Sequence, residues 1–494
     1  MRETSRTLRN AAIRVSVGCV ALFIAGCGDR GDSADVEAVA NEQVPPNFLI
    51  LIGDDMGKET LSCYDVSSSP ARTPNINELC ANGVVFDSFW TQPFCSPTRA
   101  TILTGQYSAS NSVRYPVMPN LESTIAQPEK AADANPELRI MKPEDILKVV
   151  PEEAFRASRG LKIGQQTLPG VLKALNPQYV TGAFGKWHLA DPVNGGVEHP
   201  TRAGFDEYDG VIDGTMISHF AWKQVTDGVE RPATGYTTSR IVDDTQQWIS
   251  AQEQPWFAWV AFTTPHDPYH LPPLTLLSEE SAALDGEAVR VGPDNPYFRA
   301  AIEAMDTEIG RLLASIPADE LANTYVLFIS DNGSPRDVAS APYSKQKVKG
   351  TVYQGGIDMP FIVVGPGIEP GRYPHLANST DIFASVLELA GVDTDTSDFS
   401  DVGDDSVSFA PGLLKKSDQS PRDWIYADGS LMESVPIDRA IRNTRYKLAN
   451  IKGAEFFFDL EEDPFETINL LDAELSAAQT TEYESLRATL EQFQ

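Results

Sequence analysis

The hexapeptide at residues 95–100, Cys-Ser-Pro-Thr-Arg-Ala, places a thiol and a guanidinium one helical turn apart. Ser96 is a typical N-cap, and Pro97 suits the first position of a helix. Cys95 is therefore expected just before a helix N-terminus, where free backbone N–H groups favour an anion. Arg99 adds a planar fork of donors suited to a tetrahedral oxyanion. A buried structural cysteine beside a turn is the alternative, because free cysteine is among the most buried residue types.

Two sets of oxygen-bearing side chains each follow a predicted strand. Asp54 and Asp55 come directly after the apolar run 48–52, and Asp331 and Asn332 follow a second strand further along the chain. Glycines on both sides of the acidic pair are expected to allow a tight turn that aims both carboxylates at one point. Adjacent carboxylates are unfavourable unless a cation lies between them, and four hard oxygen donors suit Ca²⁺ or Mg²⁺. Either motif alone could be a solvated turn, but together at strand ends they favour a metal site.

Three further segments carry lysine and histidine side chains next to predicted strands. Lys186 and His188 lie in the run Gly-Lys-Trp-His, and His266 lies in Thr-Pro-His-Asp-Pro. Lys349 directly precedes a glycine-rich run. A histidine taken alone is more often a packed or surface residue than a catalytic one, and His270 is a rival to His266. Because ligands bind at the carboxyl ends of strands in open α/β sheets, we expect these side chains to converge on one site.

Taken together, these segments resemble the type I sulfatase family. The cysteine hexapeptide matches the family signature Cys-x-Pro-x-Arg, and the Gly-Lys-Trp-His and Pro-His-x-Pro segments occur in the family's order. The resemblance covers roughly residues 46–471, since the segments at 446–448 and 463–464 are similar to the end of bacterial sulfatases. Ala190 stands where many members have glycine, and the stretch 117–163 looks longer than usual, which leaves the substrate pocket open.

The resemblance implies hydrolysis of a sulfate ester and maturation of Cys95. In the family a formylglycine-generating enzyme oxidises this cysteine to formylglycine, and the aldehyde hydrate is the nucleophile. Arg99 and a divalent metal, Ca²⁺ with Mg²⁺ as the alternative, would favour the alkoxide form of the hydrate. The implied metal ligands combine both acidic motifs with the modified residue: Asp54, Asp55, Cys95, Asp331 and Asn332.

The same resemblance implies a role for each remaining side chain. Asp331 is the candidate base for the attacking hydroxyl. Lys186 and Lys349 would balance charge on the sulfuryl oxygens. His266, together with Lys349, would protonate the leaving alcohol. His188 would then take the proton from the second hydroxyl of the hydrate, so that sulfate is expelled and the aldehyde is regenerated.

Three other functions stay open on the sequence alone. Phosphonate and phosphodiester hydrolases share the fold, the formylglycine and the metal, but by the family pattern they tend to carry histidine where this chain has Asn332. A non-catalytic lipoprotein that binds sulfated glycans would not need the full set of candidate catalytic residues. A thiol hydrolase using Cys95 would have no role for the four oxygen ligands. The substrate, a sulfated small molecule or glycan, is not identified, although Trp222, His219 and His270 are candidates to line its pocket.

The N-terminal residues look like an export signal rather than part of a fold. Four arginines precede or flank the apolar run 15–25, which is too short to span a membrane comfortably. The run ends in Ile-Ala-Gly-Cys, which resembles a bacterial lipobox cut before Cys27. We therefore expect a lipoprotein signal peptide at 1–26 and a flexible tether at 27–46. The protein would be a periplasmic or cell-surface lipoprotein that meets the membrane only through a lipid at Cys27; an ordinary cleaved signal peptide is the alternative.

Composition narrows the class of partner. The chain has 494 residues and a net charge of −31, which argues against nucleic acid as a partner. The length suggests two domains.

Cys63 and Cys80 remain once the signal, anchor and hexapeptide cysteines are set aside. An exported context permits a disulfide between them, and two free thiols are an equal alternative.

Strand and helix patterns alternate along the chain, which predicts an α/β fold. The resemblance specifies a large mixed central sheet flanked by helices, as in alkaline phosphatase, for a catalytic domain at 47–395. A smaller C-terminal α+β subdomain with an antiparallel sheet is expected at 396–494, after a Pro-, Gly- and Asp-rich link. The individual predictions are strands at 48–52, 179–184, 256–262, 325–329, 361–364, 424–427, 438–443, 446–451 and 455–460, and helices at 73–83, 143–150, 301–316, 380–389 and from about 473.

Overall fold

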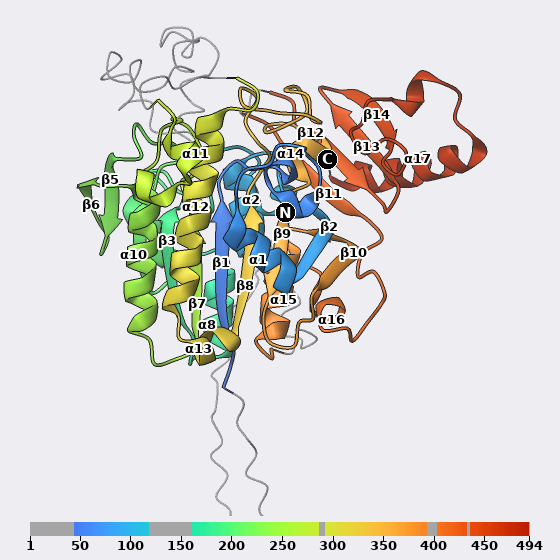
Figure 1. Cartoon of the computed structure of the whole chain (residues 1–494). Coiled ribbons are helices and arrows are strands. Elements are labelled where there is room, and N and C mark those ends of the chain that lie inside the picture. Colours follow the sequence, from blue (N-terminus) through green and yellow to red (C-terminus); the bar gives the residue numbers. More distant parts are fainter. Residues whose placement is uncertain (1–43, 118–159, 286–291, 393–402, 432–434, 494) are drawn as a thin grey trace, which may run out of the picture. The chain divides into compact units, whose positions relative to one another are not determined.

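A ten-stranded mixed sheet carries the fold (Figure 1). The computed structural model describes residues 44–117, 160–285, 292–392, 403–431 and 435–493. The strand order in the sheet is β10-β2-β9-β8-β1-β7-β3-β4-β5-β6. The strands are β1 (Asn47–Gly53), β2 (Val84–Trp90), β3 (Val180–Lys186), β4 (Glu207–Val211), β5 (Ala221–Thr226), β6 (Val229–Thr234), β7 (Trp256–Ala261), β8 (Thr324–Ser330), β9 (Phe361–Val364) and β10 (Gly371–Asn378).

The middle of the sheet is parallel. Strands β8, β1, β7, β3 and β4 run in one direction, whereas β9 lies antiparallel between β8 and β2. In β1, Phe48, Ile50 and Ile52 face one side of the sheet, and Leu49 and Leu51 face the other. All five side chains are buried, as expected for a parallel strand covered on both faces. The predicted α/β fold with a large mixed sheet is confirmed.

Helices cover both faces of this sheet. One face packs against α2 (Cys95–Thr104), α8 (Leu168–Leu175) and α15 (Asp381–Leu389). The other face packs against α1 (Pro74–Asn82), α10 (Thr237–Ser250) and α12 (Pro296–Ser315), with α10 and α12 drawn in front of the sheet in Figure 1. Apolar side chains from the helices and strands form two separate cores, so the sheet is rigid where its strands end.

Shorter helices connect these elements. They are α3 (Ser108–Asn111), α9 (His199–Arg202), α11 (Glu279–Ala282), α13 (Ala318–Ala322), α14 (Gln354–Ile357) and α16 (Ala410–Leu413), with 3₁₀ turns η1 (Lys58–Thr60), η2 (Ser62–Tyr64), η3 (Gly196–Glu198), η4 (Leu274–Leu276), η6 (Leu470–Asp472) and η7 (Glu491–Phe493). Within the described ranges, no helix is both long and apolar enough to cross a membrane.

A four-stranded antiparallel sheet follows near the C-terminus. Its strands, in spatial order, are β11 (Ile425–Gly429), β12 (Asp438–Arg442), β13 (Tyr446–Ile451) and β14 (Ala454–Asp459), and α17 (Ala477–Leu490) packs on it. A shared apolar cluster joins this sheet to Trp90 and Leu376 of the large sheet. The predicted α+β subdomain is therefore present. The predicted boundary at 395/396 falls outside the described residues, as do the signal peptide, the Cys27 anchor and the helix predicted at 143–150.

Three helix starts differ from the sequence prediction: those of α12 and α17, and that of α2, which is described with the site. Helix α12 begins at Pro296 rather than at residue 301, because Asn295 caps it by accepting from the N–H groups of Tyr297 and Phe298. Helix α17 begins later than predicted, after Ser476, which forms a capping box with Gln479. Strands β2, β4, β5, β6 and β10 were not among the sequence predictions.

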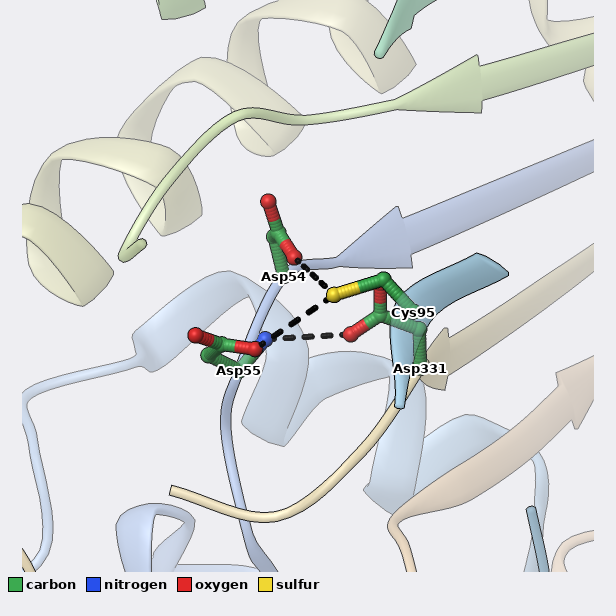
Figure 2. A group of neighbouring side chains, drawn as sticks. All are labelled: Asp54, Asp55, Cys95 and Asp331. Atoms are coloured by element: carbon green, nitrogen blue, oxygen red, sulfur yellow. Dashed lines mark hydrogen bonds between the residues drawn. The ribbon is translucent and has the colours of Figure 1, made fainter. Parts of the chain in front are cut away.

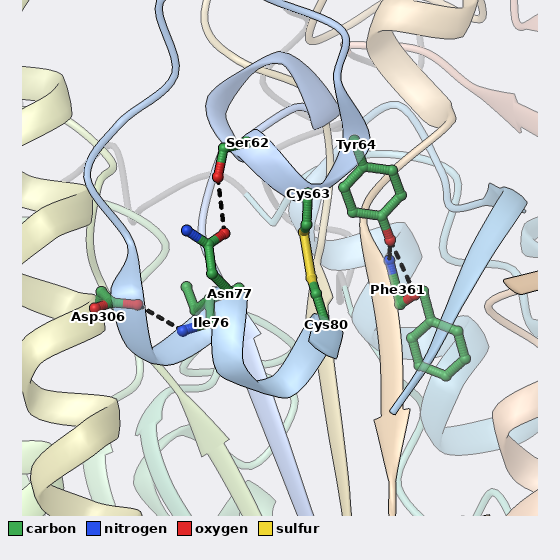
Figure 3. Close-up of a disulfide and its surroundings, with 8 residues drawn as sticks. All are labelled: Ser62, Cys63, Tyr64, Ile76, Asn77, Cys80, Asp306 and Phe361. Atoms are coloured by element: carbon green, nitrogen blue, oxygen red, sulfur yellow. Dashed lines mark hydrogen bonds between the residues drawn. A yellow bond between two sulfur atoms is a disulfide. The ribbon is translucent and has the colours of Figure 1, made fainter. Parts of the chain in front are cut away.

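Cys63 and Cys80 form a disulfide, which resolves the alternative left open by the sequence (Figure 3). The bond joins η2 to α1, with the two Cα atoms 6.4 Å apart. Beside it, the Tyr64 hydroxyl donates to Phe361 O (2.9 Å) and accepts from Phe361 N (2.7 Å). Ile76 N donates to Asp306 Oδ1 at 2.7 Å. The segment directly after the Asp54-Asp55 pair is thereby tied to β9 and α12.

Candidate active site

The predicted site residues meet at the carboxyl ends of neighbouring strands. Strands β8, β1, β7 and β3 are consecutive in the sheet, and their parallel segments end side by side. Asp54 follows β1, Asp331 follows β8, His266 follows β7, and Lys186 is the last residue of β3. Helix α2 brings Cys95 to the same edge. The predicted convergence is confirmed.

Cys95 lies among three carboxylates (Figure 2). Its Sγ is 3.5 Å from Asp54 Oδ1 and 3.8 Å from Asp55 Oδ1. One ligand atom from each of Asp54, Asp55, Cys95 and Asp331 lies within 4.8 Å of the others, and all four residues are buried. Three buried carboxylates at this separation repel one another strongly unless cations compensate them.

Two lysines compensate the acidic pair. Lys186 Nζ is 2.6 Å from Asp54 Oδ2, and Lys349 Nζ is 2.5 Å from Asp55 Oδ2. Each aspartate therefore gives one oxygen to a lysine and turns the other oxygen toward the Cys95 sulfur. Lys186 Nζ is itself 3.7 Å from Cys95 Sγ. A chemical group attached to the side chain of residue 95 would therefore have the Lys186 ammonium group beside it.

Arg99 compensates the third carboxylate. Its Nη2 and Nε donate to Asp331 Oδ2 at 2.9 and 3.2 Å, and its Nη1 donates to Lys186 O at 2.6 Å. The second oxygen of Asp331, Oδ1, accepts from the Asp55 N–H at 3.1 Å. Thr98 Oγ1, one turn into α2, donates to Asp331 O at 2.6 Å. Helix α2 is thus fastened to the end of β8 by two side chains of the hexapeptide.

Asn332 supplies a fourth oxygen that points to metal binding. Its Nδ2 donates to Asp55 Oδ1 at 2.7 Å, while its Oδ1 is buried and has no hydrogen-bond partner among the described residues. An unpartnered buried amide oxygen is unfavourable unless something binds it. Together with the carboxylates of Asp54, Asp55 and Asp331 it offers the hard donor set that Ca²⁺ or Mg²⁺ prefers. The residues present therefore fit a divalent metal.

The turn after β1 is not built as the sequence suggested. Neither flanking glycine adopts a left-handed conformation; Asp55 itself does, with φ of 73°. Gly57 is extended, with φ of −79°, and a Cβ there would lie 2.1 Å from Glu59 Oε2. A Cβ on Gly53 would lie 2.6 Å from Met56 Sδ. The Met56 and Glu59 side chains therefore pack closely on the two glycines, and the tight turn itself is made by the aspartate.

Helix α2 starts two residues before the position predicted from Pro97. Cys95 is its first residue, and extended Phe94 (φ −139°, ψ 157°) is the N-cap, with no side chain capping the helix. Ser96 does not cap; its Oγ accepts from Val117 N at 2.9 Å. The expected placement of the Cys95 side chain at a helix N-terminus still holds, so the positive end of the helix faces the site.

His266 lies close to the acidic pair. Its Nε2 is 3.6 Å from Asp55 Oδ2, and its Nδ1 is 3.0 Å from Asp267 Oδ1. Burial alone would lower the pKa of His266, but nearby carboxylates, Asp55 first and Asp267 with it, together outweigh this effect and raise the pKa to about 9. The imidazole is then protonated at neutral pH and has a proton to donate, as the proposed role requires.

His188 differs from the other predicted residues, because none of its described hydrogen bonds reaches the acidic cluster. Its Nε2 is 2.7 Å from Val117 O, its Nδ1 is buried without a partner among the described residues, and its backbone is left-handed (φ 57°). The ring packs on Gly214, where a Cβ would lie 2.0 Å from Nε2. Burial lowers the pKa of His188 well below its usual range, and Lys186 and Arg99 lower it further. The imidazole is therefore neutral and able to accept a proton.

The titration of the central thiol disfavours a simple cysteine nucleophile. Burial raises the pKa of the Cys95 thiol well above its usual range, and the Asp331 carboxylate adds to this effect. Burial alone would lower the pKa values of Lys186 and Lys349, but the neighbouring carboxylates outweigh it and raise both. The cluster thus holds a protonated thiol beside charged ammonium groups. Thiol-based catalysis needs the thiolate, usually formed by a nearby base.

A model of the sulfatase family matches residues 46–392. This chain belongs to the sulfatase family. It is 28% identical over 379 residues to N-acetylgalactosamine-6-sulfatase from Canis lupus familiaris, an alignment that covers 70% of this chain and 63% of that relative. The aligned region therefore spans less than two thirds of the relative's length.

Solved structures share the fold of this chain. The crystal structure of Ps i-CgsB in complex with k-i-k-neocarrahexaose has a TM-score of 0.70 at 21% identity, and the match covers 91% of this chain and 94% of that chain. The structure of BT4656 in complex with its substrate D-glucosamine-2-N,6-O-disulfate has a TM-score of 0.65 at 20% identity, with 91% and 98% covered. The alkaline-phosphatase-like architecture implied by the sequence is confirmed.

The three residues suggested as pocket lining do not lie together in the structure. His219 and His270 lie next to His266 and to each other. Trp222 is buried in β5 and lines a separate small cavity with Thr237 and other residues of α10 and β4. A larger cavity of about 500 Å³ lies between α1, α12 and α13 and includes none of the candidate catalytic residues. Cavity size therefore does not mark the site in the described part of the chain.

Sequence reasoning missed two buried residues, Ser334 and Glu59, that join the loops of the candidate site. Ser334 Oγ accepts from Gly57 N at 3.1 Å, and Ser334 O accepts from Lys349 N at 3.1 Å. The Ser334 hydroxyl donates to Glu59, whose pKa is raised by burial. A serine directly after Asp-Asn-Gly looks like an ordinary turn residue, so no local signal in the sequence identifies it.

Proposed function

We propose that this protein hydrolyses sulfate esters, with residue 95 acting as formylglycine rather than as cysteine. The observation that carries the proposal is the setting of Cys95: a protonated, buried thiol at a helix N-terminus, with two carboxylate oxygens and Lys186 Nζ within 3.8 Å of its sulfur. Such surroundings suit a hydroxyl that must be oriented and deprotonated beside an anion. Membership of the sulfatase family supports the same reaction.

A divalent metal belongs to the proposal, held by Asp54, Asp55, Asp331 and Asn332 together with residue 95. The unpartnered Asn332 Oδ1 and the mutual distances of the acidic cluster support this ligand set. When bound, the metal supplies Lewis-acid stabilisation of an oxyanion and of the sulfuryl oxygens. We propose Ca²⁺, with Mg²⁺ as the alternative, because all the protein ligands are hard oxygens.

The hydrated aldehyde supplies one hydroxyl that attacks sulfur and a second whose deprotonation expels sulfate. Asp331 accepts the proton of the attacking hydroxyl, while Arg99 holds this carboxylate in place through two hydrogen bonds. Lys186, 3.7 Å from the residue-95 sulfur, offsets negative charge on the sulfuryl group. Its existing contact with Asp54 keeps the ammonium in position before the substrate arrives.

Two histidines with opposite protonation states transfer the remaining protons: one donates to the leaving alcohol, and the other accepts from the second hydroxyl of the hydrate. The protonated His266, with Lys349 on the same Asp55 oxygen, donates to the leaving alcohol. The neutral His188 accepts the proton of the second hydroxyl, since its Nδ1 is buried and unpartnered among the described residues. A pair of titratable groups whose surroundings push their pKa values apart is the usual arrangement for an acid and a base in one site.

We propose a sulfated carbohydrate as the substrate class. The relatives and neighbours named above are an N-acetylgalactosamine-6-sulfatase, a neocarrahexaose complex and a complex with D-glucosamine-2-N,6-O-disulfate, and all three names contain a sugar. Asn332, rather than the histidine typical of phosphonate and phosphodiester hydrolases, favours a sulfate ester over those substrates. The position of the sulfate on the sugar is outside this proposal.

The first experiment is peptide mass spectrometry of the segment around residue 95, on protein from its native host or co-expressed with a formylglycine-generating enzyme. An aldehyde in place of the thiol, together with turnover of an aryl sulfate, supports the proposal. The Cys95→Ala variant is the matched control and should lose turnover. Faster hydrolysis of phosphate diesters would favour the phosphodiesterase alternative. An unmodified thiol with activity that survives chelation would favour a thiol hydrolase, and binding of sulfated glycans without turnover would favour a binding protein.

We further propose that the chain is exported and anchored through a lipid on Cys27. The support is the arginine-rich start, the apolar run 15–25 and the lipobox-like sequence before Cys27. Fractionation of the native host tests it: the protein should sediment with membranes, and a Cys27→Ala variant should not carry the lipid. Membrane association of the alanine variant equal to that of the unchanged protein would contradict the anchor.

A further inference from the structure

His219 is a buried histidine that the proposed reaction does not use. It precedes β5, is 2% exposed, and its Nε2 lies 3.0 Å from the main-chain oxygen of His266. Its Nδ1 lies 3.3 Å from Thr237 Oγ1, and Thr263 Oγ1 donates to Thr237 Oγ1 at 3.1 Å. The main chain of His219 is also held, because its carbonyl oxygen accepts from Thr237 N at 2.9 Å.

The contact with the His266 carbonyl places a proton on Nε2 of His219. A main-chain carbonyl only accepts, so the proton of the His219 ring must be on Nε2 and points to His266 O. In the neutral ring Nδ1 is then an acceptor, which the Thr237 hydroxyl fills, and the Thr263 hydroxyl in turn donates to Thr237. Burial lowers the pKa of His219 well below its usual range, and neighbouring His270 lowers it further, which is consistent with a neutral ring.

His270 covers this contact from the other side. Its ring stacks on that of His219, with the centroids 4.3 Å apart and an interplanar angle of 29°. Its Nδ1 lies 2.9 Å from Pro268 O, and its Nε2 lies 3.1 Å from the Tyr236 hydroxyl. The loop that carries His266 is therefore held at two main-chain oxygens, by one histidine each, and neither contact involves the acidic cluster.

We propose that His219 is a positioning residue for His266, an inference that rests on the proposed function of this site. A hydrogen bond to the carbonyl of His266 restrains the plane of the peptide bond that follows His266, and so limits how far the main chain that carries the imidazole can shift. The imidazole then stays near Asp55, 3.6 Å from Oδ2, with its Nε2 proton facing the place where an alcohol must leave. A proton donor misplaced by about 1 Å can reduce the rate about a hundredfold.

The test compares His219→Phe, which keeps an aromatic ring but removes the donor, with His219→Gln, whose amide N–H can reach the same oxygen. Turnover is measured on aryl sulfates whose phenols range from good to poor leaving groups. For poor leaving groups the phenylalanine variant should lose about 10- to 100-fold in kcat with little change in KM, and for nitrophenyl sulfate much less, because only the former need proton donation. The glutamine variant should recover part of the loss.

His199→Phe is the matched control. His199 is equally buried, its Nε2 lies 2.7 Å from the main-chain oxygen of Leu161, and its Nδ1 accepts from Trp187 Nε1 at 3.1 Å, so the lost hydrogen bonds are of the same kind. This control should leave the dependence of kcat on leaving-group pKa unchanged. The same dependence in His219→Phe as in the unchanged enzyme would overturn the inference.

Two measurements distinguish failure of the proposed function from failure of the positioning role: the activity of the unchanged protein and a structure of the variant. An unchanged protein that does not hydrolyse any sulfate ester would count against the function itself. The positioning role would then be decided by a crystal structure of His219→Phe: the His266 imidazole should move away from Asp55, and an imidazole in its original place would refute the role.

Discussion

Lys447 of β13 and Glu466, which follows β14, form a buried ion pair that contacts the main chain of the segment after Lys349. Their side chains are 0% and 1% exposed, and Lys447 Nζ is 2.5 Å from Glu466 Oε1. Lys447 Nζ also donates to Val352 O at 2.6 Å and lies 4.9 Å from the centre of the Trp90 ring system. Glu466 Oε2 accepts from Gln354 N, the first residue of α14, at 2.7 Å. Every charged group in this contact therefore has a partner.

Neutralising one member should be strongly destabilising. Glu466→Gln keeps the shape but leaves a buried ammonium with neutral acceptors only, and Lys447→Met leaves a buried carboxylate with a single N–H donor. Breaking a buried ion pair by removing one partner costs about 3–5 kcal/mol of unfolding free energy. Removing both charges avoids the unpaired ion, so the double variant should cost about 1–3 kcal/mol, far less than the sum of the two single variants.

The assay is urea unfolding followed by circular dichroism and tryptophan fluorescence, used where the two transitions coincide. The exposed pair Arg202–Glu198 is the control, since both side chains are about half exposed and Glu198→Gln should cost less than about 1 kcal/mol. Because α14 follows the glycine-rich run after Lys349, the single variants should also lower kcat. The reasoning is refuted if the single variants cost no more than the surface control, or if the double variant costs their sum.

Three further predictions concern separate groups. Burial raises the pKa of Asp428 to about 6, against the opposing effect of Arg114, so folding disfavours the charged carboxylate. The Asp428→Asn variant should therefore have an unfolding free energy up to about 3 kcal/mol higher at pH 7. This gain, measured by denaturation, should vanish below about pH 4, where the carboxyl group is protonated in both the folded and the unfolded state. Gly214→Ala places a Cβ 2.0 Å from His188 Nε2 and should lower kcat at least about tenfold; an unchanged kcat would remove His188 from the mechanism. Asn332→Ala removes the unpartnered Oδ1 and should weaken Ca²⁺ or Mg²⁺ binding at least about tenfold in a titration of chelator-stripped protein, and equal affinity would exclude this ligand.

The parts of the site that the sequence predicts are those attached to strand ends. Asp54, Asp331 and His266 each come within a few residues of the end of a continuous apolar run, and parallel neighbours bring such ends together whatever the rest of the chain does. His219 and Ser334 carry no such mark. Their importance comes from hydrogen bonds to His266 O and Gly57 N, which lie 47 and 277 residues away in the sequence. The spacing of apolar residues along a segment cannot reveal contacts between residues so far apart.

The fold divides in the same way. Buried parallel strands such as β1 and β8 are apolar along their whole length and are predicted from that pattern. Strand β6, Val229–Thr234, lies at the edge of the sheet, is almost wholly exposed and contains Pro232, so its residues resemble a loop. Strand β10 is half exposed at its start and is recognised only by its pairing with β2. Edge strands are defined by their partners rather than by their own composition.

The pairing of acids and bases at the site links stability to the proposed chemistry. Each of the three buried carboxylates has a close cationic partner, and two of these cations, Lys186 and Lys349, are also the groups proposed to face the sulfuryl oxygens and the leaving alcohol. Because Asp54 and Asp55 already hold the two ammonium groups, little reorganisation is needed when an anion arrives. Substituting either lysine would remove a catalytic charge and also leave a buried carboxylate unpaired. Loss of activity in such variants therefore reports on catalysis only after their loss of stability has been measured separately. The His219 variants avoid this difficulty, because they leave all three ion pairs intact.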